Sequence, residues 1–247
     1  MGDLVNEGQE RASSRILVVD DHPVVRQGLA LALGRHSGLS VCGEAGSLPE
    51  ALRAINECRP DLVLADLDLD GASGIDLVKA VRESHPGLPV LILSMHDEDV
   101  YAERVLRAGA CGYLMKQESP ERVAAGVMAA LAGEIVLSEN MKRKILHNIS
   151  GRKTDKASGG LDKLTDRELE VFRHIGDGMS TRQIAEKLTL SIKTVEAHIA
   201  HVKTKLKVES GRELQHMAFA WTMGGKTGGE KALGEKTIGE KGVTPPD

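Results

Sequence analysis

Aromatic side chains are scarce in this sequence, whose 247 residues include one Trp, two Tyr and two Phe. Proteins that bind single-stranded nucleic acid stack its bases on aromatic rings, so this scarcity argues against that class. No apolar run approaches the ~20 residues of a membrane-spanning helix, so no membrane partner is expected. Residues 1–14 are acidic and lack an apolar stretch, so we expect a disordered segment there and no secretory signal.

Cysteine is also sparse, with Cys42, Cys58 and Cys111 widely spaced among apolar neighbours. An odd number of cysteines at such spacing does not make a disulfide framework. We therefore expect reduced thiols packed in a core, as in a cytoplasmic protein.

The net charge of −4, from 32 Lys and Arg against 36 Asp and Glu, conceals an uneven distribution. Residues 15–134 carry a net charge of −7, residues 135–160 carry +4, and residues 161–221 are nearly neutral. A chain of this length has room for two domains of ordinary size. The charge distribution therefore indicates an acidic first domain, a basic connector and a separate second domain.

From Arg15 onward, short runs of Val, Ile and Leu alternate with amphipathic stretches, which is the pattern of buried parallel strands joined by helices. Residues 15–134 are therefore predicted to form an α/β domain with a doubly wound, five-stranded parallel sheet of the flavodoxin-like type. The expected strands are 16–19, 40–45, 61–65, 89–93 and 111–115, and the expected helices are 24–33, 48–57, 75–84, 100–108 and 120–132.

The composition changes after this domain. Residues 135–160 are predicted to be a linker, since 151–160 reads GRKTDKASGG and is polar and rich in Gly. Residues 222–247 contain the repeats GEKAL, GEKTI and GEKGV, which hold too few apolar side chains to offset the entropy of ordering. We expect a disordered tail there and a small all-helical domain over 161–221.

Polar residues follow four of the five predicted strands: Asp20 and Asp21 the first, Asp66 the third, Ser94 the fourth and Lys116 the fifth. Because the carboxyl ends of parallel strands meet at one edge of a sheet, we expect these side chains to lie together. Clustered carboxylates repel one another and attract a hard cation such as Mg²⁺. A carboxylate in such a site acts as a nucleophile toward a phosphoryl group, whose oxygens the ammonium and hydroxyl groups then stabilise.

Asp66 is the candidate nucleophile, and a backbone carbonyl near Asp68 is expected to complete the metal shell. Asp68 and Asp70 add negative charge beside Asp66, and two effects stay open, tighter metal binding or slower phosphorylation. The same segment resembles the opening of a calcium-binding EF-hand loop, with acids at positions 1, 3 and 5 and Gly71 at position 6. Leu77 stands at position 12, where that loop needs Glu, and the segment follows a strand, so the EF-hand interpretation fails.

The predicted helical domain has clear helix starts. Thr165 to Glu168 and Ser180 to Gln183 are capping boxes, and Ser191 caps a longer helix over 191–207. A short helix, a tight turn at 189–190 and a longer amphipathic helix make a helix-turn-helix. On the polar face of the longer helix, small side chains permit close approach to base edges and lysines suit phosphates, which predicts binding to duplex DNA. The apolar stripe is Val195, Ile199, Val202 and Leu206, and the opposite face carries Lys193, Glu196, Ala197, Ala200, Lys203 and Lys205.

The segments VVDDHPVVRQGL, DLVLADLDLDGASGIDLV, ILSMHDE and AGACGYLMK resemble the receiver domains of bacterial two-component response regulators over residues 15–132. The resemblance implies that Asp66 accepts a phosphoryl group from a sensor histidine kinase and that Asp20 and Asp21 bind Mg²⁺. It also implies that Lys116 senses the phosphate, that Ser94 is the switch hydroxyl and that Tyr113 moves inward with it. One departure is Asp70, which stands where the family usually has Pro.

The segment LTDRELEVFRHIGDGMSTRQIAEKLTLSIKTVEAHIAHVKTKLKV resembles the LuxR-type DNA-binding domain, and its pairing with a receiver resembles the NarL/FixJ type of response regulator. Glu196, Ala197 and Ala200 then correspond to positions that read bases. For His198 and His201, hydrogen bonding or phosphate contact is favoured over metal binding, since no further ligand is apparent. The resemblance places Lys193, Thr194, Val195 and His198 in the signature stretch of the recognition helix.

The predicted function is therefore a DNA-binding transcription regulator, not an enzyme, that is controlled by phosphorylation of Asp66 and forms a homodimer when phosphorylated. Residues 211–221 are expected to supply the dimer contact. Two alternatives stay open: a phosphorelay adaptor that acts by protein–protein contact without sequence-specific DNA binding, and a metal-dependent phosphatase, for which no separate acid–base partner is apparent.

Overall fold

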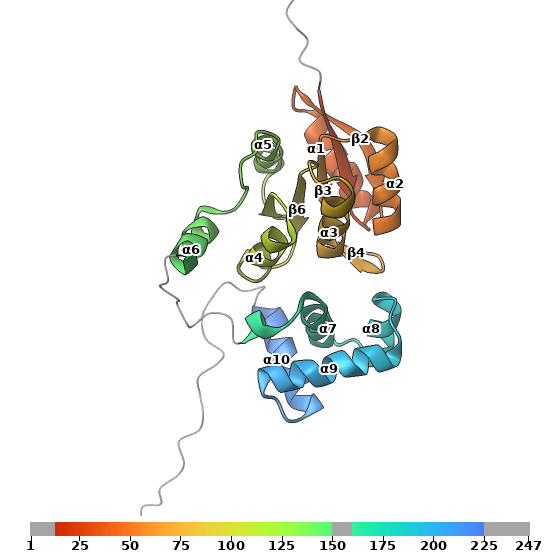
Figure 1. Cartoon of the computed structure of the whole chain (residues 1–247), viewed down its shortest axis with the longest axis vertical. Helices are drawn as coiled ribbons and strands as arrows, with labels where there is room; N and C mark the ends of the chain where they lie inside the picture. The colour runs from red at the N-terminus through yellow and green to blue at the C-terminus, as the bar shows by residue number, and fades with distance from the viewer. Residues whose placement is uncertain (1–12, 150–159, 225–247) are drawn as a thin grey trace, which may run out of the picture.

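The five predicted strands form one parallel sheet in the order β2-β1-β3-β6-β7 (Figure 1). The structure is a computed structural model that describes residues 13–149 and 160–224. The first strand pairs with two neighbours and carries a fully buried apolar run, as a central strand should. The prediction of a doubly wound α/β domain is confirmed. The strands are β1 Ser14–Val19, β2 Leu39–Ala45, β3 Leu62–Ala65, β6 Val90–Ser94 and β7 Gly112–Met115.

Helices cover both faces of this sheet. The face packed by α1 and α5 has its own apolar cluster, which includes Leu33 and Val123, and the face packed by α2, α3 and α4 has another, which includes Ile55 and Val105. Proline occupies the first turn of α1, α2 and α5, where a missing N–H costs no hydrogen bond. The bounds are α1 Pro23–Gly34, α2 Leu48–Cys58, α3 Gly74–Ser84, α4 Glu98–Ala108 and α5 Pro120–Leu131.

Two features of the first domain differ from the sequence-based expectation. Strands β4 Asp68–Leu69 and β5 Ala72–Ser73 form a small antiparallel hairpin directly after the candidate nucleophile, with Gly71 in the left-handed region at φ +73°. Helix α6 Glu139–Ile149 lies within the interval predicted as linker and contacts α4. The expected disordered segments fall largely on residues 1–12, 150–159 and 225–247, outside the described residues.

The second domain is helical and uses the predicted caps. Thr165 and Ser180 each accept a backbone hydrogen bond in a reciprocal capping box, and Ser191 accepts one from Thr194. Phe172 packs at its centre, with its ring 5.7 Å from that of Trp221. The elements are a 3₁₀ turn η1 Leu161–Lys163, then α7 Asp166–Gly176, α8 Thr181–Lys187, α9 Ile192–Leu206 and α10 Gly211–Gly224.

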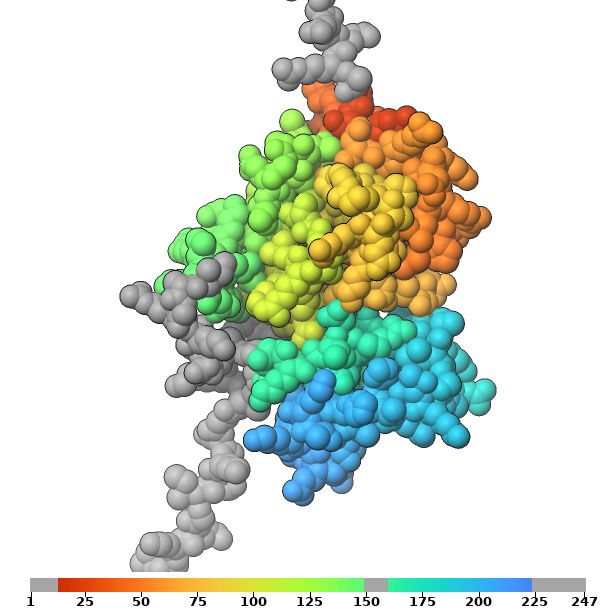
Figure 2. All heavy atoms as spheres, viewed as in Figure 1, coloured from red at the N-terminus to blue at the C-terminus, as the bar shows by residue number. Residues whose placement is uncertain are grey.

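The two domains are in contact through η1, helix α7 and the turn between α8 and α9 (Figures 1 and 2). Arg104 of α4 donates to the carbonyl oxygens of Leu161 at 2.7 Å and Leu164 at 2.8 Å, and Lys79 of α3 pairs with Asp166 at 2.9 Å. Helix α9 lies on the side of α7 and α8 that faces away from the first domain (Figure 1). No described helix is long and apolar enough to cross a membrane.

Gly74 offers a test of how the candidate nucleophile is positioned. A Cβ at Gly74 would lie 2.3 Å from the carbonyl oxygen of Asp66, whereas a Cβ at Gly28, exposed on α1, would meet nothing within 4 Å. We predict that Gly74→Ala lowers the free energy of unfolding by about 2–3 kcal/mol, because backbone must move. Gly28→Ala is the matched control and should raise it by roughly 0.5–1 kcal/mol. Urea titration of both variants gives the measurement, and equal effects would contradict this packing.

Candidate functional site

The predicted acidic residues and Lys116 meet at the carboxyl edge of the sheet. The Nζ of Lys116 lies 2.5 Å from Oδ2 of Asp20 and 2.7 Å from Oδ2 of Asp66. Both carboxylates are almost fully buried, with 1% and 6% of their area exposed, while Asp21 beside them is half-buried. One ammonium therefore faces two buried carboxylates and a third nearby, and the pocket carries an excess of negative charge.

The pKa of Asp66 reflects both its burial and the negative charge around it. Burial raises the pKa of Asp66 from 3.8 to about 6, although the adjacent Lys116 ammonium lowers it, and the nearby Asp20 and Asp68 raise it further. The same carboxylates raise the pKa of Lys116 above its usual range against the effect of burial. At neutral pH the pocket thus holds an ionised nucleophile in a place that favours additional positive charge.

A divalent cation fits this donor set. Single ligand atoms of Asp20, Asp21, His22 and Asp66 lie within 4.8 Å of one another. Carboxylate oxygens are the ligands that Mg²⁺ prefers, and a second positive charge would offset the burial and the carboxylate repulsion that together raise the pKa of Asp66. His22 was not predicted; its Nδ1 lies 2.5 Å from Oδ1 of Asp21, and its ring is largely exposed. The backbone carbonyl near Asp68 stays a prediction as a ligand.

Ser94 and Tyr113 lie in one hydrogen-bonded chain behind the pocket. Both are fully buried. The backbone N–H of His96 donates to the Ser94 hydroxyl at 3.1 Å, and the Tyr113 hydroxyl donates to the His96 carbonyl at 2.7 Å. The two predicted switch side chains therefore hold the backbone of the same residue, at the start of the loop into α4.

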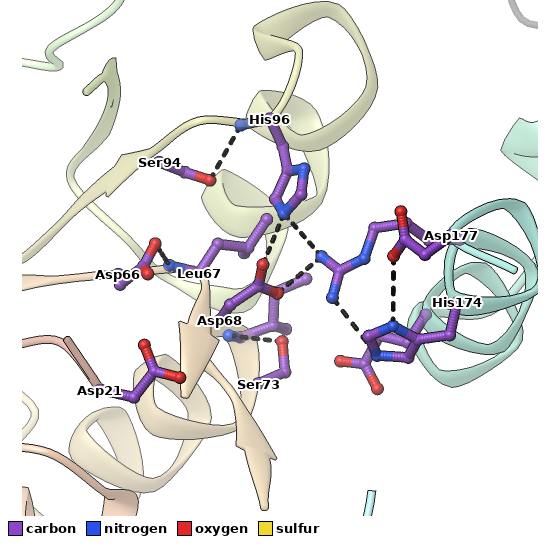
Figure 3. Close-up of polar contacts among 12 residues, drawn as sticks. Asp21, Asp66, Leu67, Asp68, Ser73, Ser94, His96, His174 and Asp177 are labelled. Carbon is purple, nitrogen blue, oxygen red and sulfur yellow. Dashed lines mark hydrogen bonds and ion pairs between the residues drawn. The ribbon is translucent and has the colours of Figure 1, made fainter. Parts of the chain in front are cut away.

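The side chain of Asp68 forms a separate cluster with groups from α7 (Figure 3). Its Oδ2 lies 2.6 Å from Nε2 of His96, and its Oδ1 lies 2.6 Å from a guanidinium nitrogen of Arg173. Although burial opposes ionisation, the His96 hydrogen bond and the Arg173 charge hold the pKa of Asp68 well below its usual range. The sequence places two negative charges beside Asp66. Asp68 is paired with His96 and Arg173, and the side chain of Asp70 is exposed to solvent.

Arg173 completes this cluster, although no pattern in the sequence points to it. It belongs to the second domain, and only 6% of its side chain is exposed. The same guanidinium nitrogen lies 2.7 Å from His96 Nε2, so Arg173 touches residues two positions after both Asp66 and Ser94. A buried arginine on an amphipathic helix is a signal, but no local pattern indicates a partner more than 100 residues away.

The polar face of α9 is open to solvent. Ala197 is exposed, and of the predicted DNA contacts only His198, Lys203 and Lys205 are half-buried. Lys205 has a partner inside the domain, since its Nζ lies 2.6 Å from the buried carboxylate of Glu168, and His201 lies 3.7 Å from the same group. The exposed members of the predicted set are Lys193, Thr194, Glu196, Ala197, Ala200 and His201.

Two family models match the two domains separately. The model for the response regulator receiver domain matches residues 16–127. The model for bacterial regulatory proteins of the luxR family matches residues 162–218. The predicted order of a receiver followed by a LuxR-type DNA-binding domain is confirmed.

Known proteins match across both domains. The chain is 41% identical over 207 residues to the transcriptional activator protein ExaE of Pseudomonas putida, covering 82% of this chain and 94% of that one. It is 35% identical over 209 residues to the oxygen regulatory protein NreC of Staphylococcus epidermidis, covering 83% and 96%. Among solved structures, RcsB of Salmonella enterica serovar Typhimurium, bound to the promoter rprA with the phosphomimetic BeF3⁻, matches with a TM-score of 0.62 and 25% identity, covering 84% and 98%.

The raised pKa of Asp66 predicts a pH-dependent effect of its removal. An acid whose pKa is higher in the folded than in the unfolded protein destabilises the fold once it ionises. For Asp66, this loss of unfolding free energy is absent below about pH 4 and complete above about pH 6. In metal-free buffer, Asp66→Asn should therefore raise the free energy of unfolding by about 1–3 kcal/mol at pH 7.5. The gain should vanish at pH 4. A gain of equal size at both values would show that the charge of Asp66 is not its cause.

Proposed function

This chain belongs to the response regulators that join a receiver domain to a LuxR-type DNA-binding domain, the NarL/FixJ type, and we propose that it is switched by phosphoryl transfer to Asp66. It is a phosphorylation-regulated DNA-binding transcription regulator. The observation that carries the assignment of Asp66 is its buried carboxylate, held 2.7 Å from the only ammonium among the described residues of this pocket.

The transfer follows from the groups in the pocket. A carboxylate oxygen of Asp66 attacks the phosphorus of a phosphohistidine on a sensor histidine kinase, and the P–N bond breaks as the O–P bond forms. Asp20, Asp21 and Asp66 would hold Mg²⁺, which supplies positive charge to the phosphoryl oxygens when bound. Lys116 already lies beside Asp66 and is placed to pair with the new phosphoryl group, while Ser94 offers a hydroxyl.

The cluster at Asp68 gives this reaction a route to the second domain. When Ser94 turns its hydroxyl to the phosphoryl group, it gives up the bond from the His96 backbone N–H. Asp68 accepts from Arg173 through Oδ1 and from His96 through Oδ2, so movement of either loop weakens the contact with α7. We propose that Arg173 keeps the two domains together before phosphorylation and is released after it.

Separation of the two domains matters for DNA binding because the receiver hairpin lies against the turn between α8 and α9. A Cβ at Gly71, between β4 and β5, would come within 3.1 Å of the hydroxyl oxygen of Thr189, which lies in the turn between α8 and α9. The docked receiver therefore stands at the N-terminal end of the recognition helix. We propose that this contact fixes the position of α9 against the receiver, so that its exposed polar face meets duplex DNA in the geometry of a dimer only after the domains separate.

A dimer on paired half-sites is part of the proposal. Phe219 and Met223 on α10 leave about half of their area exposed, and they offer an apolar contact to a second copy. Relatives of this fold, such as RcsB, bind promoter DNA, and one solved structure holds two RcsB dimers on two parallel DNAs. A cytoplasmic location and a regulatory role without enzymatic turnover accord with this function.

Phosphorylation of Asp66 should strengthen DNA binding. With Mg²⁺ and a small-molecule phosphoryl donor, the affinity of the wild-type protein for a selected duplex should rise at least tenfold, while that of Asp66→Asn should not change. The measurement is fluorescence anisotropy over a range of salt concentrations, where electrostatic duplex binding should weaken steeply. An equal rise in both proteins would remove Asp66 from the switch.

A second prediction isolates the interdomain contact. Truncating one partner of a hydrogen-bonded charge pair in an interface costs about 2–3 kcal/mol or more, which corresponds to a shift of roughly 30-fold or more in the docking equilibrium. Asp68→Asn should therefore raise DNA affinity without any phosphoryl donor, by at least fivefold.

Asp70→Asn is the matched control, since it removes the same charge two residues away from an exposed position on the receiver. Neither substitution touches the DNA-binding surface. Asp70→Asn should leave the affinity within twofold of wild type. If both variants bind alike, general electrostatics and not the Arg173 contact governs docking.

A further inference from the structure

Two of the three free cysteines lie against each other at the edge of the receiver sheet. The Sγ atoms of Cys42 on β2 and Cys58 at the end of α2 are 3.1 Å apart, and both residues are half-buried. Cys111 is separate from them, with its Sγ 3.2 Å from the carbonyl oxygen of Val90. The sequence predicts three reduced thiols packed in a core, and their spacing does not pair these two.

An irregularity in β2 produces the pairing. The register between β1 and β2 runs from Ile16 with Val41 to Leu17 with Gly43, so Cys42 is an extra residue in a bulge of the edge strand. Gly43 leaves the space next to it open, since a Cβ there would lie 3.3 Å from the Sγ of Cys58. The bulge and the missing side chain together allow the two sulfur atoms to meet.

We propose that Cys42 and Cys58 form a redox-active dithiol that closes reversibly to a disulfide by exchange with a small-molecule disulfide such as oxidised glutathione. A disulfide bond is about 2.05 Å long, so the sulfur atoms need to approach by only about 1 Å. The element that carries each cysteine is already in place, because α2 packs directly on β2.

The reaction proceeds in two exchanges. The thiolate of Cys42 attacks one sulfur of the small disulfide, forming a mixed disulfide and expelling a thiolate that takes up a proton. The thiolate of Cys58 then attacks the Cys42 sulfur, the Cys42–Cys58 bond forms, and the second small thiol leaves. The protein loses two electrons and two protons, and one small disulfide becomes two thiols.

The environment of Cys58 suits it to the second step. Burial and the neighbouring Cys42 raise the pKa of Cys58 to about 11, so little of it is ionised at neutral pH. A thiol of this kind competes poorly for an external disulfide. Against a mixed disulfide held at contact distance, the high effective concentration compensates for its small thiolate fraction.

The bond would tie the end of α2 to the edge strand and close a loop between two cysteines that are 16 positions apart. A cross-link over a loop of this length restricts the unfolded chain and stabilises the fold. Oxidation should therefore raise the melting temperature of the receiver by about 5 °C, and a reducing agent should reverse the shift.

The test is a thiol count on the full chain in glutathione mixtures of increasing oxidised fraction. After acid quench, unfolding and alkylation, the reduced protein should take three alkyl groups. The oxidised protein should take one, on Cys111, with no glutathione attached, and peptide mapping should find Cys42 joined to Cys58. Three alkyl groups at every mixture, glutathione retained on one cysteine, or a cross-link through Cys111 would each overturn the proposal.

Two variants make the result specific. Cys58→Ser removes the second nucleophile, so it should accumulate glutathione on Cys42 and lose the reversible melting shift. Cys111→Ser is the matched control, of the same chemistry in the same domain, and should oxidise and melt as wild type does. If Cys58→Ser shows the same reversible melting shift as wild type, the shift does not come from this pair.

Discussion

The ion pair between Arg173 and Asp68 is the contact on which, in our proposal, the docking of the two domains depends. Other interdomain contacts, such as those of Arg104 and Lys79, join surfaces away from the phosphorylation pocket. Arg173 lies against both loops that flank this pocket, two residues beyond Asp66 and two beyond Ser94. An arginine suits this place because its planar guanidinium keeps its charge when buried and donates in several directions at once.

Both the phosphorylation pocket and the interdomain contact place carboxylates beside cationic groups. The carboxylate pKa is raised in the pocket, at Asp66, and lowered at the contact, at Asp68. Lys116 is shared between two buried carboxylates, and the raised pKa of Asp66 shows that this compensation is incomplete. Asp68 has two partners of its own, His96 and Arg173, which depress its pKa although burial opposes this. The pocket of Asp66 thus favours added positive charge, and the contact between Asp68 and Arg173 beside it is stable until a neighbouring loop moves. A switch needs these two properties in adjacent places.

Much of this structure was predictable because its determinants are local. Dense runs of Val and Ile predict the strands, the capping boxes at Thr165 and Ser180 predict helix starts, and the carboxyl edge of a parallel sheet gathers Asp20, Asp66 and Lys116. The hairpin after Asp66 was missed because strands of two residues leave no periodicity to read. The Arg173 contact was missed because it depends on how two separately folded domains dock.

The most direct test is the distance between the domains with and without phosphorylation. Spin labels on exposed positions 57 of α2 and 215 of α10, in a chain whose native cysteines are replaced by serine, report that distance by pulsed electron resonance. We expect one narrow distance distribution for the unmodified protein, and a broader, longer one with Mg²⁺ and beryllofluoride that Asp66→Asn abolishes. The same narrow distribution in all three samples would contradict this expectation.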